Sequence, residues 1–394
     1  MVDAAISPTR KALDDRATVN RFVDLAVRGL VPMFDSKKQL FCYTLKKQNG
    51  AMVQEGISER YTMMTLMGLH RLEQAGTASP FDKERILQAL FSDLTWMDNI
   101  GDLGVLLWTL GIVCPERYAQ LESRLDLKTA LTRYRDARKV LTMELAWFLI
   151  GLSYWAQVDP EKRSQLEPIA FEVFKTLKGN QGERGFFGHL STSASLAGMA
   201  RGRTGSFADQ VYPIYGMAQF SKAYGQQEAA LLAIKCANGI CEEQGPMGQW
   251  WWHYDAPGGR VTDGYPVFSV HQHAMAPFTL FGLGEVIGRN FDECIYKGLR
   301  WINSQNELSY DMEDQNNGVI WRCIMRSRRS PARYLKAGLR IYSDTIQHSR
   351  PEDLKVLFEC RPYELGWLLY AFANRRLASS SKSESRGNVA VGTL

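Results

Sequence analysis

The feature that most constrains the fold of this chain is a set of six segments that are apolar on nearly all sides. Each is rich in Gly or Ala and opens with a polar or charged cluster. A helix that is apolar all round must be buried against neighbours all round, so we predict six helices at the centre of the fold. The segments are EGISERYTMMTLMGLHRL (55–72), DLGVLLWTLGI (102–112), LTMELAWFLIGLSYW (141–155), ADQVYPIYGMAQFSKAYG (208–225), YPVFSVHQHAMAPFTLFGLGE (265–285) and RPYELGWLLYAFANR (361–375).

More amphipathic, charged segments separate these six, at 82–97, 160–177, 226–242 and 291–305. Apolar residues in both kinds of segment recur at three- and four-residue spacing, which is typical of helices. The alternation predicts an all-α fold, an (α/α)6 toroid, complete or incomplete, whose inner helices ring a central funnel and whose polar helix ends form its mouth. An open superhelix of helix pairs is the alternative. We expect a single toroid domain over 11–378, with disordered ends at 1–10 and in the Ser-rich tail 379–394.

The composition is that of an ordinary globular protein, since 45% of the 394 residues are hydrophobic and 23% are charged. The formal net charge of +5 is mild for this length, so no nucleic-acid partner is expected. The seven cysteines are scattered and odd in number, which indicates reduced, buried thiols. The N-terminus has no apolar signal core, and no apolar run is long enough to span a membrane. We therefore expect a cytoplasmic protein without a transmembrane segment.

One stretch, GQWWWHYDAPGGRVTDGYPVFSVHQHAMAP at 248–277, has the composition of a binding-site wall. It packs three consecutive tryptophans, several histidines and two aspartates around a Gly- and Pro-rich turn. Consecutive side chains point in different directions, so at least one of Trp250, Trp251 and Trp252 is expected to reach a surface or cleft. There its ring would stack on a sugar or stabilise a carbocation. The alternative is that two are core residues and the third is a structural brace.

The histidines of this stretch are candidates for acid–base chemistry. The turn at Pro257–Gly259 is predicted to bring His253 and Asp255 near His271. An imidazole placed by an aspartate acts as a base near neutral pH; the alternative is a hydrogen-bonded structural imidazole. The spacing of His271 and His273 suits a metal pair, but no third ligand pattern is visible, so neither a metal nor another cofactor is expected.

Acidic residues lie at or near the openings of the apolar segments, at Glu55, Asp102, Glu144, Asp209 and Glu364. A carboxylate beside a helix N-terminus is often only a cap, and we interpret most of them so. Glu144 differs because it lies one turn inside an apolar helix with no adjacent cation in the sequence, and such a carboxylate needs a partner or a function. Asp209 follows two arginines and precedes Tyr212 and Tyr215, so it is a second candidate for the site.

A basic segment at 322–340 carries seven cations and no acid. They are Arg322, Arg326, Arg328, Arg329, Arg333, Lys336 and Arg340. Guanidinium forks bind carboxylate, sulfate or phosphate with paired hydrogen bonds. The segment therefore predicts an anionic ligand such as an acidic glycan, a nucleotide sugar or a diphosphate, and the alternative is a basic surface loop.

Two short patterns resemble known toroids. Gln244, Gly248 and Trp250 are spaced as Q-x-x-x-G-x-W, which resembles the QW repeat of terpenoid cyclases and protein prenyltransferases. A looser echo lies at Gln305, Gly318 and Trp321. The resemblance implies a toroid in which Gln and Trp tie an outer helix to the next turn. The acidic D-x-D-D and D-D-x-x-D motifs of those enzymes are absent.

A second resemblance is to toroidal carbohydrate enzymes: glucuronyl epimerases, uronate lyases and unsaturated-glucuronyl hydrolases. FADQVYPIYGMAQFSKAYG at 207–225 is similar to an inner helix of the epimerases, and GQWWWHYD at 248–255 is similar to turns in such enzymes. This resemblance implies a saccharide substrate and assigns no catalytic residue.

These patterns predict an enzyme that acts on an acidic, uronic-acid-like saccharide or another anionic small molecule, by elimination, epimerisation or hydrolysis, in an aromatic- and Arg-lined funnel. The expected catalytic residues are His253, His271, Tyr212, Glu144 and Asp209. The expected substrate contacts are Trp250, Trp251, Trp252, Tyr254, Asp255, His273, Tyr215, Arg203, Arg326, Arg329 and Glu364. A terpenoid cyclase or prenyl-transfer enzyme is one alternative, and a non-catalytic helical-repeat scaffold is the other.

Overall fold

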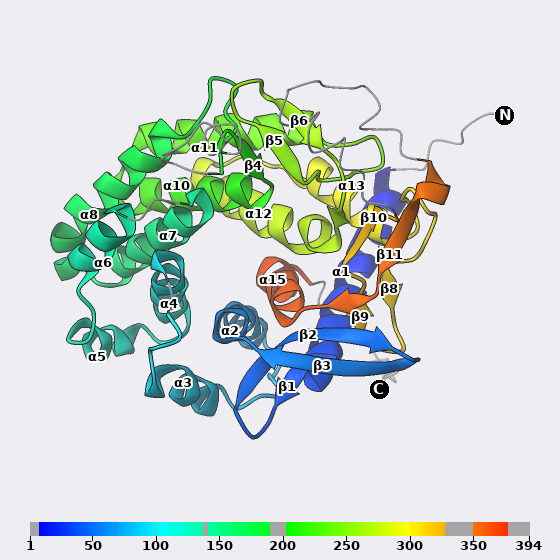
Figure 1. Cartoon of the computed structure of the whole chain (residues 1–394), viewed down its shortest axis with the longest axis horizontal. Helices are drawn as coiled ribbons and strands as arrows, with labels where there is room; N and C mark the ends of the chain where they lie inside the picture. The colour runs from blue at the N-terminus through cyan, green and yellow to red at the C-terminus, as the bar shows by residue number, and fades with distance from the viewer. Residues whose placement is uncertain (1–7, 98, 137–140, 190–201, 328–349, 377–394) are drawn as a thin grey trace, which may run out of the picture.

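The computed structural model describes residues 8–97, 99–136, 141–189, 202–327 and 350–376, and helices dominate them (Figure 1). Six of the described helices form an inner ring, and each apolar segment supplies one of them. They are α2 (Glu59–Gln74), α4 (Ile100–Val113), α7 (Thr142–Val158), α10 (Ala208–Tyr224), α12 (Ala276–Ile287) and α15 (Pro362–Phe372). Each packs against the next in chain order, and α15 packs against α2, so the ring is closed. The predicted toroid is confirmed, and the open superhelix is excluded.

Outer helices alternate with the inner ones along the chain. They are α1 (Pro8–Leu30), α3 (Lys83–Ser92), α5 (Tyr118–Glu122), α6 (Leu127–Asp136), α8 (Pro160–Gly179), α11 (Gln227–Glu242) and α13 (Asp292–Ile302). The four predicted amphipathic segments form α3, α8, α11 and α13. A π-helix, η3 (His271–Met275), leads into α12, and four short 3-10 turns complete the described helical elements: η1 (Val31–Met33), η2 (Pro115–Arg117), η5 (Pro351–Asp353) and η6 (Ala373–Arg375).

Glycines let neighbouring inner helices approach backbone to backbone. A Cβ atom on Gly68 of α2 would lie 2.0 Å from the carbonyl oxygen of Gly366 of α15. A Cβ on Gly104 of α4 would lie 2.3 Å from the backbone nitrogen of Phe148 of α7, and one on Gly151 would lie 2.6 Å from the Gly104 carbonyl oxygen. No larger residue fits these positions without moving a helix, which explains why the buried segments are rich in glycine.

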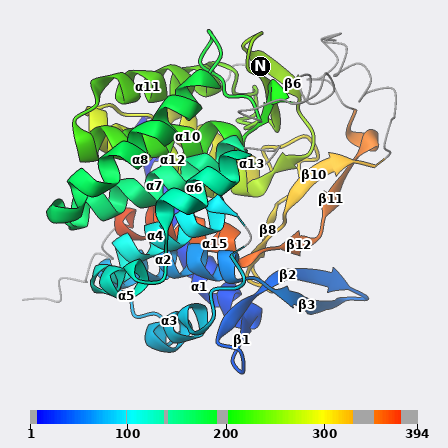
Figure 2. The ribbon, with the colours of Figure 1, turned by 60° about the vertical axis from the view of Figure 1, so that its left-hand side comes forward.

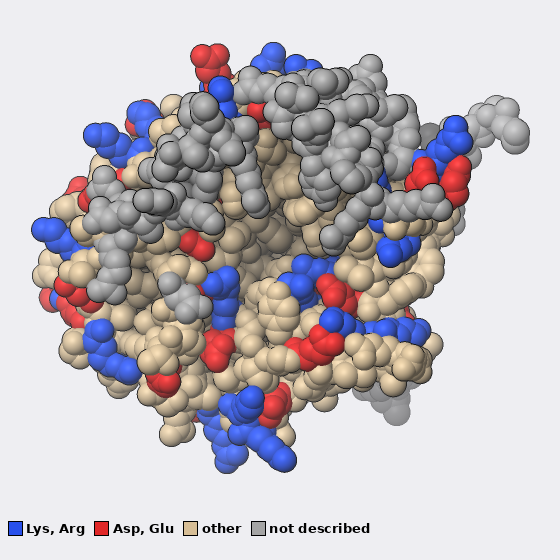
Figure 3. Space-filling model, in the orientation of Figure 1, with Lys and Arg blue, Asp and Glu red and all other residues tan. Residues whose placement is uncertain are grey.

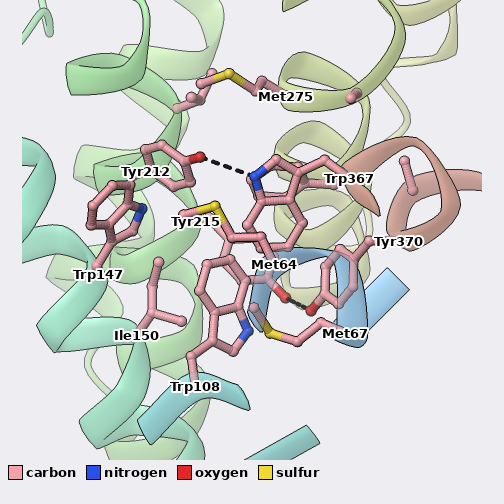
Figure 4. Packing of buried hydrophobic residues seen from close by; sticks show 14 of the residues in the cluster. Met64, Met67, Trp108, Trp147, Ile150, Tyr212, Tyr215, Met275, Trp367 and Tyr370 are labelled. Atoms are coloured by element: carbon pink, nitrogen blue, oxygen red, sulfur yellow. Dashed lines mark hydrogen bonds between the residues drawn. The ribbon is translucent and has the colours of Figure 1, made fainter. Parts of the chain in front are cut away.

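Aromatic side chains fill the interior of the ring (Figure 4). Trp108 of α4 stacks on Trp367 of α15 with ring centroids 5.0 Å apart. The Trp367 indole donates a hydrogen bond to the Tyr212 hydroxyl at 3.1 Å, and the hydroxyls of Tyr215 and Tyr370 lie 2.8 Å apart. All five side chains are buried. The axis is therefore a packed core, and a polar substrate is expected at the end of the ring rather than along its axis.

Short antiparallel strands, which the sequence pattern did not predict, gather at the end of the ring where the inner helices begin (Figure 2). In the first sheet, β2 (Leu40–Gln48) pairs with β1 (Phe34–Asp35), β3 (Ala51–Ile57) and β12 (Glu359–Cys360). The others are β4 (Thr204–Ser206) with β5 (His253–Asp255) and β6 (Arg260–Asp263), β7 (Val267–Phe268) with β10 (Cys323–Arg326) and β11 (Leu354–Leu357), and β8 (Glu313–Asp314) with β9 (Val319–Ile320). Because β3, β4, β7 and β12 lead into α2, α10, η3 and α15, they build the rim of this end, which we call the mouth.

The two ends predicted to be disordered lie mostly outside the described residues, which run from 8 to 376 with internal gaps; α1 already begins at Pro8. Among the described helices, none is long and apolar enough to cross a membrane.

Candidate functional site at the mouth of the ring

Charged side chains stand in the first turns of the inner helices. Arg60 and Asp209 are the second residues of α2 and α10, and Asp102, Glu144 and Glu364 are the third residues of α4, α7 and α15. These helices begin at the same end of the ring, so the charges meet at the mouth. Figure 3 shows a hollow at the centre of this face, with basic and acidic side chains beside it.

Asp102 is held by a cation from the neighbouring inner helix. It is buried, and its Oδ1 accepts a hydrogen bond from Arg60 Nε at 2.6 Å. The Arg60 guanidinium also lies over the ring of Trp147, 5.5 Å from its centroid. Asn99 caps α4 by accepting from the backbone nitrogens of Gly101 and Asp102, which leaves the aspartate side chain available for Arg60.

Glu144 is held by a tyrosine of the outer helix α6, ten residues before it in the chain. The hydroxyl of Tyr134, on α6, donates to the Glu144 carboxylate and accepts from the backbone nitrogen of Leu141 at 2.8 Å. Burial is the main influence on Glu144 and raises its pKa, against the opposing effects of Tyr134, Arg60 and His189. Glu144 therefore keeps a proton to higher pH than an exposed glutamate, as a general acid requires.

Asp102 and Glu144 are neighbours because α4 and α7 touch through glycine. A Cβ on Gly101 would lie 2.9 Å from Cγ of Glu144, so the Glu144 side chain lies against the first turn of α4. The negative charge of Asp102 contributes to the raised pKa of Glu144, and Arg60 opposes it. The mouth thus holds two carboxyl groups of different character beside one guanidinium.

A histidine–aspartate pair lies next to these groups. His189 Nδ1 is 2.9 Å from Oδ2 of Asp209, which also accepts from the backbone nitrogen and hydroxyl of Ser206, each at 2.8 Å. The His189 carbonyl accepts from the backbone nitrogen of Thr142 at 3.0 Å, which ties this histidine to the start of α7 near Glu144. The Asp209 Oδ1 atom is buried and has no hydrogen-bond partner among the described residues.

Two of the three tryptophans of the predicted wall are core residues. Trp250 and Trp251 are buried, whereas Trp252 is partly exposed. Trp252 stacks on His253, with ring centroids 4.1 Å apart and planes 22° from parallel, and meets Phe268 edge-on at 5.7 Å. Of the three tryptophans in this run, Trp252 is the one with part of its surface exposed.

His253 stands on β5, and its charge contributes to lowering the pKa of His271. His271 packs against the rings of Phe207 and Phe268, at 4.5 and 5.2 Å, and burial lowers its pKa to about 3. Burial also lowers the pKa of His273 to about 3, and neither of its ring nitrogens has a partner among the described residues. Both side chains are neutral near pH 7, which makes each a weak base.

Gln244 of the QW-like pattern has the bracing contacts that the resemblance implies. Its side-chain amide donates to the carbonyl oxygens of Gly248 and Cys294, each at 3.0 Å, so it joins the end of α11 to the start of α13.

The other predicted site residues lie as follows. Tyr212 and Tyr215 belong to the aromatic interior, Tyr254 is buried against Phe186, and Asp255 accepts a turn hydrogen bond from Gly258. Glu364 is fully buried and paired with Arg322, which also pairs with Glu359. Arg326 pairs with Asp263, and Arg203 is exposed. Arg329 and the rest of the basic segment through Arg340 lie outside the described residues. Tyr212, Tyr215, Tyr254 and Glu364 are buried, so their positions do not support the roles in catalysis or substrate binding that the sequence predicted for them.

Sequence reasoning missed Arg60, Tyr134 and His189, and it interpreted Asp102 as a cap. The sequence carries one signal for Arg60, which stands in the first turn of its apolar helix as the acidic residues do in theirs. The other two come from outside the inner helices, so only the folded structure brings them to Glu144.

A separate cavity of about 420 Å³ lies away from the mouth, lined by α1, α13 and the segment that follows α13. Its polar groups satisfy one another: Arg21 forms a salt bridge with Glu313, and Arg300 forms one with Asp15. It contains none of the first-turn charges, so the mouth remains the better candidate site.

The closed ring and its charged mouth define the fold as an (α/α)6 toroid with a carboxylate pair at one end. No family model matches the sequence, and no curated protein matches it. Solved structures share the ring. A possible member of the GH105 family from Salmonella enterica serovar Paratyphi A superposes with a TM-score of 0.58 at 11% identity, over 95% of this chain and 96% of that one.

Two unsaturated glucuronyl hydrolases are similar in the same way. A mutant of the enzyme from Streptococcus agalactiae, complexed with dGlcA-GalNAc6S, has a TM-score of 0.55 at 13% identity, over 96% of this chain and 97% of that one. The enzyme from Bacillus sp. GL1, responsible for degradation of glycosaminoglycan, has a TM-score of 0.52 at 12% identity, over 91% and 95%. At these identities the similarity establishes the fold.

Proposed function

We propose that this protein is a carbohydrate-active hydrolase whose substrate bears a uronic-acid-like sugar, and that the reaction takes place at the mouth between Asp102 and Glu144. The carboxylate pair carries the proposal. The two groups stand in the first turns of adjacent inner helices, and both lie beside Arg60. Hydrolysis of a glycosidic bond commonly uses two carboxyl groups, one as the acid and one as the base or nucleophile.

The surroundings of the two groups assign their roles. Glu144 is the proposed acid, because burial raises its pKa and Tyr134 fixes its orientation. Asp102 is ion-paired with Arg60 and is the proposed base that activates water. His189, oriented by Asp209, is the proposed polar contact for the substrate. Trp252 is the proposed stacking surface for a sugar ring.

An acidic substrate is supported by the cations at the mouth and by the fold. The Arg60 and His189 side chains are 32% and 30% exposed, so a ligand carboxylate is able to reach them. The similar solved structures include unsaturated glucuronyl hydrolases, one of them complexed with dGlcA-GalNAc6S. A substrate with an unsaturated glucuronyl group is therefore the first to test.

Hydrolysis accounts for the site better than the other predicted reactions. Elimination and epimerisation need a base for a carbon-bound proton, and His271, predicted for that role, is buried with its pKa lowered to about 3. An isoprenoid substrate would be served by an apolar mouth, whereas this one is charged. A non-catalytic scaffold gives no reason for buried carboxyl groups, which cost stability.

The products of the reaction test the proposal. Purified protein is incubated with dGlcA-GalNAc6S and with its saturated counterpart, and the products are analysed by mass spectrometry. Hydrolysis yields two fragments that together have gained one water; elimination yields two without added water, and epimerisation leaves the mass unchanged. We expect the hydrolytic pattern. Absence of turnover on these and on a wider panel of uronic-acid oligosaccharides, or either of the other patterns, contradicts the proposal.

We also propose that the protein is cytoplasmic, because the described cysteines are free thiols.

A further inference from the structure

The cavity of about 420 Å³ between α1, α13 and the segment at β8 has a polar lining. Its volume lies in the range of roughly 300–1,000 Å³ that is typical of small-molecule sites. Such sites are usually lined mainly by apolar side chains. Among the described residues that line this cavity, in contrast, Leu299 is the one with an apolar side chain. The lining therefore suits a ligand that is polar over most of its surface.

Hydrogen bonds and ion pairs between the three elements fix the polar side chains of the lining. Arg21 of α1 donates from Nε to the two carboxylate oxygens of Glu313, at 2.9 and 3.2 Å. It also donates from a terminal nitrogen to the side-chain oxygen of Asn303, at 3.1 Å. Arg300 of α13 pairs with Asp15 of α1 at 3.4 Å. The Glu313 side chain is 3% exposed, so a buried charge belongs to the lining, and the groups are held in place before a ligand binds.

These contacts use only part of the hydrogen-bonding capacity of the lining. A guanidinium has five N–H donors, and the hydrogen bonds of Arg21 involve two of its three nitrogens. One carboxylate oxygen of Asp311 accepts from the backbone nitrogen of Glu313 at 3.1 Å, whereas a carboxylate has room for roughly four hydrogen bonds. Gln305 lines the cavity and is exposed, and its amide offers both a donor and an acceptor. Donors and acceptors therefore both remain for a ligand.

The charges of the lining select among polar ligands. The carboxylates of Asp15, Asp311 and Glu313 outnumber the two guanidiniums, each of which is already paired, so an anion is disfavoured. An ammonium group donates hydrogen bonds but accepts none, so it would leave the N–H groups of the arginines and amides without an acceptor. The described residues contain no group of three or more His, Cys, Asp or Glu side chains that could hold a metal ion. A hydroxyl both donates and accepts, so an uncharged ligand with several hydroxyls suits the whole lining.

We propose that this cavity is an accessory binding site for an uncharged saccharide unit, separate from the mouth. Arg21 and the Gln305 amide donate to sugar hydroxyls, and Asp311 accepts from them. The cavity shares no lining residue with the first turns of the inner helices. The proposal does not rest on the proposed function, because binding of a sugar in the outer layer requires no reaction at the mouth.

Saturation-transfer difference NMR on the full chain tests the proposal. The uncharged probes are galactose, N-acetylgalactosamine and lactose, and the charged probes are glucuronate and glucosamine. Gln305→Ala removes the exposed amide, and Gln305→Trp fills part of the cavity. Gln227→Ala is the matched control, because Gln227 is exposed on α11 and does not line the cavity. We expect an uncharged probe to bind native protein and Gln227→Ala alike, to bind Gln305→Ala about fivefold more weakly, and not to bind Gln305→Trp, with native melting temperatures throughout.

Hydrogen exchange of the native protein with a saturating amount of the same sugar supplies a second measurement that needs no variant. The bound sugar should slow backbone exchange in 15–21 and 299–315, and leave exchange at the mouth unchanged. The proposal is overturned if no uncharged probe binds, if only glucuronate or glucosamine binds, if binding is unchanged in Gln305→Trp, or if the protection appears at the mouth instead. Loss of hydrolysis at the mouth alters none of these outcomes.

Discussion

Replacing Gly104 by Ala tests whether the glycine contact between α4 and α7 builds the site. The added Cβ would lie 2.3 Å from the Phe148 backbone nitrogen, about 1.1 Å short of the 3.4 Å at which ordinary contact begins. The obstructing atoms are backbone, so a helix must move. Overpacking of this kind costs about 1–3 kcal/mol, and the better helix propensity of Ala returns at most about 1 kcal/mol. We expect a net loss of roughly 1–2 kcal/mol.

The assay is urea unfolding followed by circular dichroism, with Gly216→Ala of α10 as the control. The nearest atom to a Cβ on Gly216 is 3.3 Å away, so a shift of a few tenths of an ångström relieves this contact and the change should cost much less stability than Gly104→Ala. Because Asp102 and Glu144 flank the Gly104 contact, Gly104→Ala should also lower turnover about a hundredfold through misplacement of the reacting groups. If Gly104→Ala is as stable and as active as Gly216→Ala, the close contact does not position the site.

Three further predictions follow from burial and charge. Burial raises the pKa of Glu144, so the stability that this group contributes is present below the unfolded pKa near 4.5 and is lost as pH rises through the folded pKa. Glu144→Gln should therefore have a melting temperature at pH 7 no lower than that of the native protein. Thermal scans across pH check this, and a lower melting temperature of the variant at pH 7 would contradict it. The lowered pKa values of His271 and His273, about 3, mean that native stability should fall as pH drops from 6.5 toward 3, and His273→Leu should flatten that profile in acid-unfolding experiments. Trp252→Ala should raise KM with little change in melting temperature, whereas Trp251→Ala should cost about 3–5 kcal/mol of stability as a core truncation; equal effects in both assays would show that the two side chains have the same role.

The ring could be predicted from the sequence because its signal is local. A helix such as α4, buried over almost its whole length, must be apolar on all sides, and no knowledge of its neighbours is needed to see that. The strands at the mouth gave no comparable signal. β4 and β5 have three residues each and pair across some fifty residues of intervening chain, too short for an alternation pattern to register.

The site was predictable only in part, for the same reason. Glu144 and Asp209 stood out because a carboxylate on an apolar helix demands an explanation. Their partners could not be found in the sequence, since Tyr134 reaches Glu144 from α6 and His189 reaches Asp209 from a loop. The run of three tryptophans correctly indicated divergent side chains but not which one is partly exposed; the folded chain buries Trp250 and Trp251.

The most direct test of the central claim is the turnover number of Glu144→Gln on an unsaturated uronyl substrate, with Glu228→Gln as the matched control. Glu228 lies on outer helix α11, is 54% exposed and pairs with Lys178, so the same chemical change there leaves the mouth intact. If Glu144 is the acid, its replacement should lower kcat at least about a hundredfold with the melting temperature retained, while Glu228→Gln keeps native activity. Native kcat in a folded Glu144→Gln protein would contradict the assignment of catalysis to the carboxylate pair.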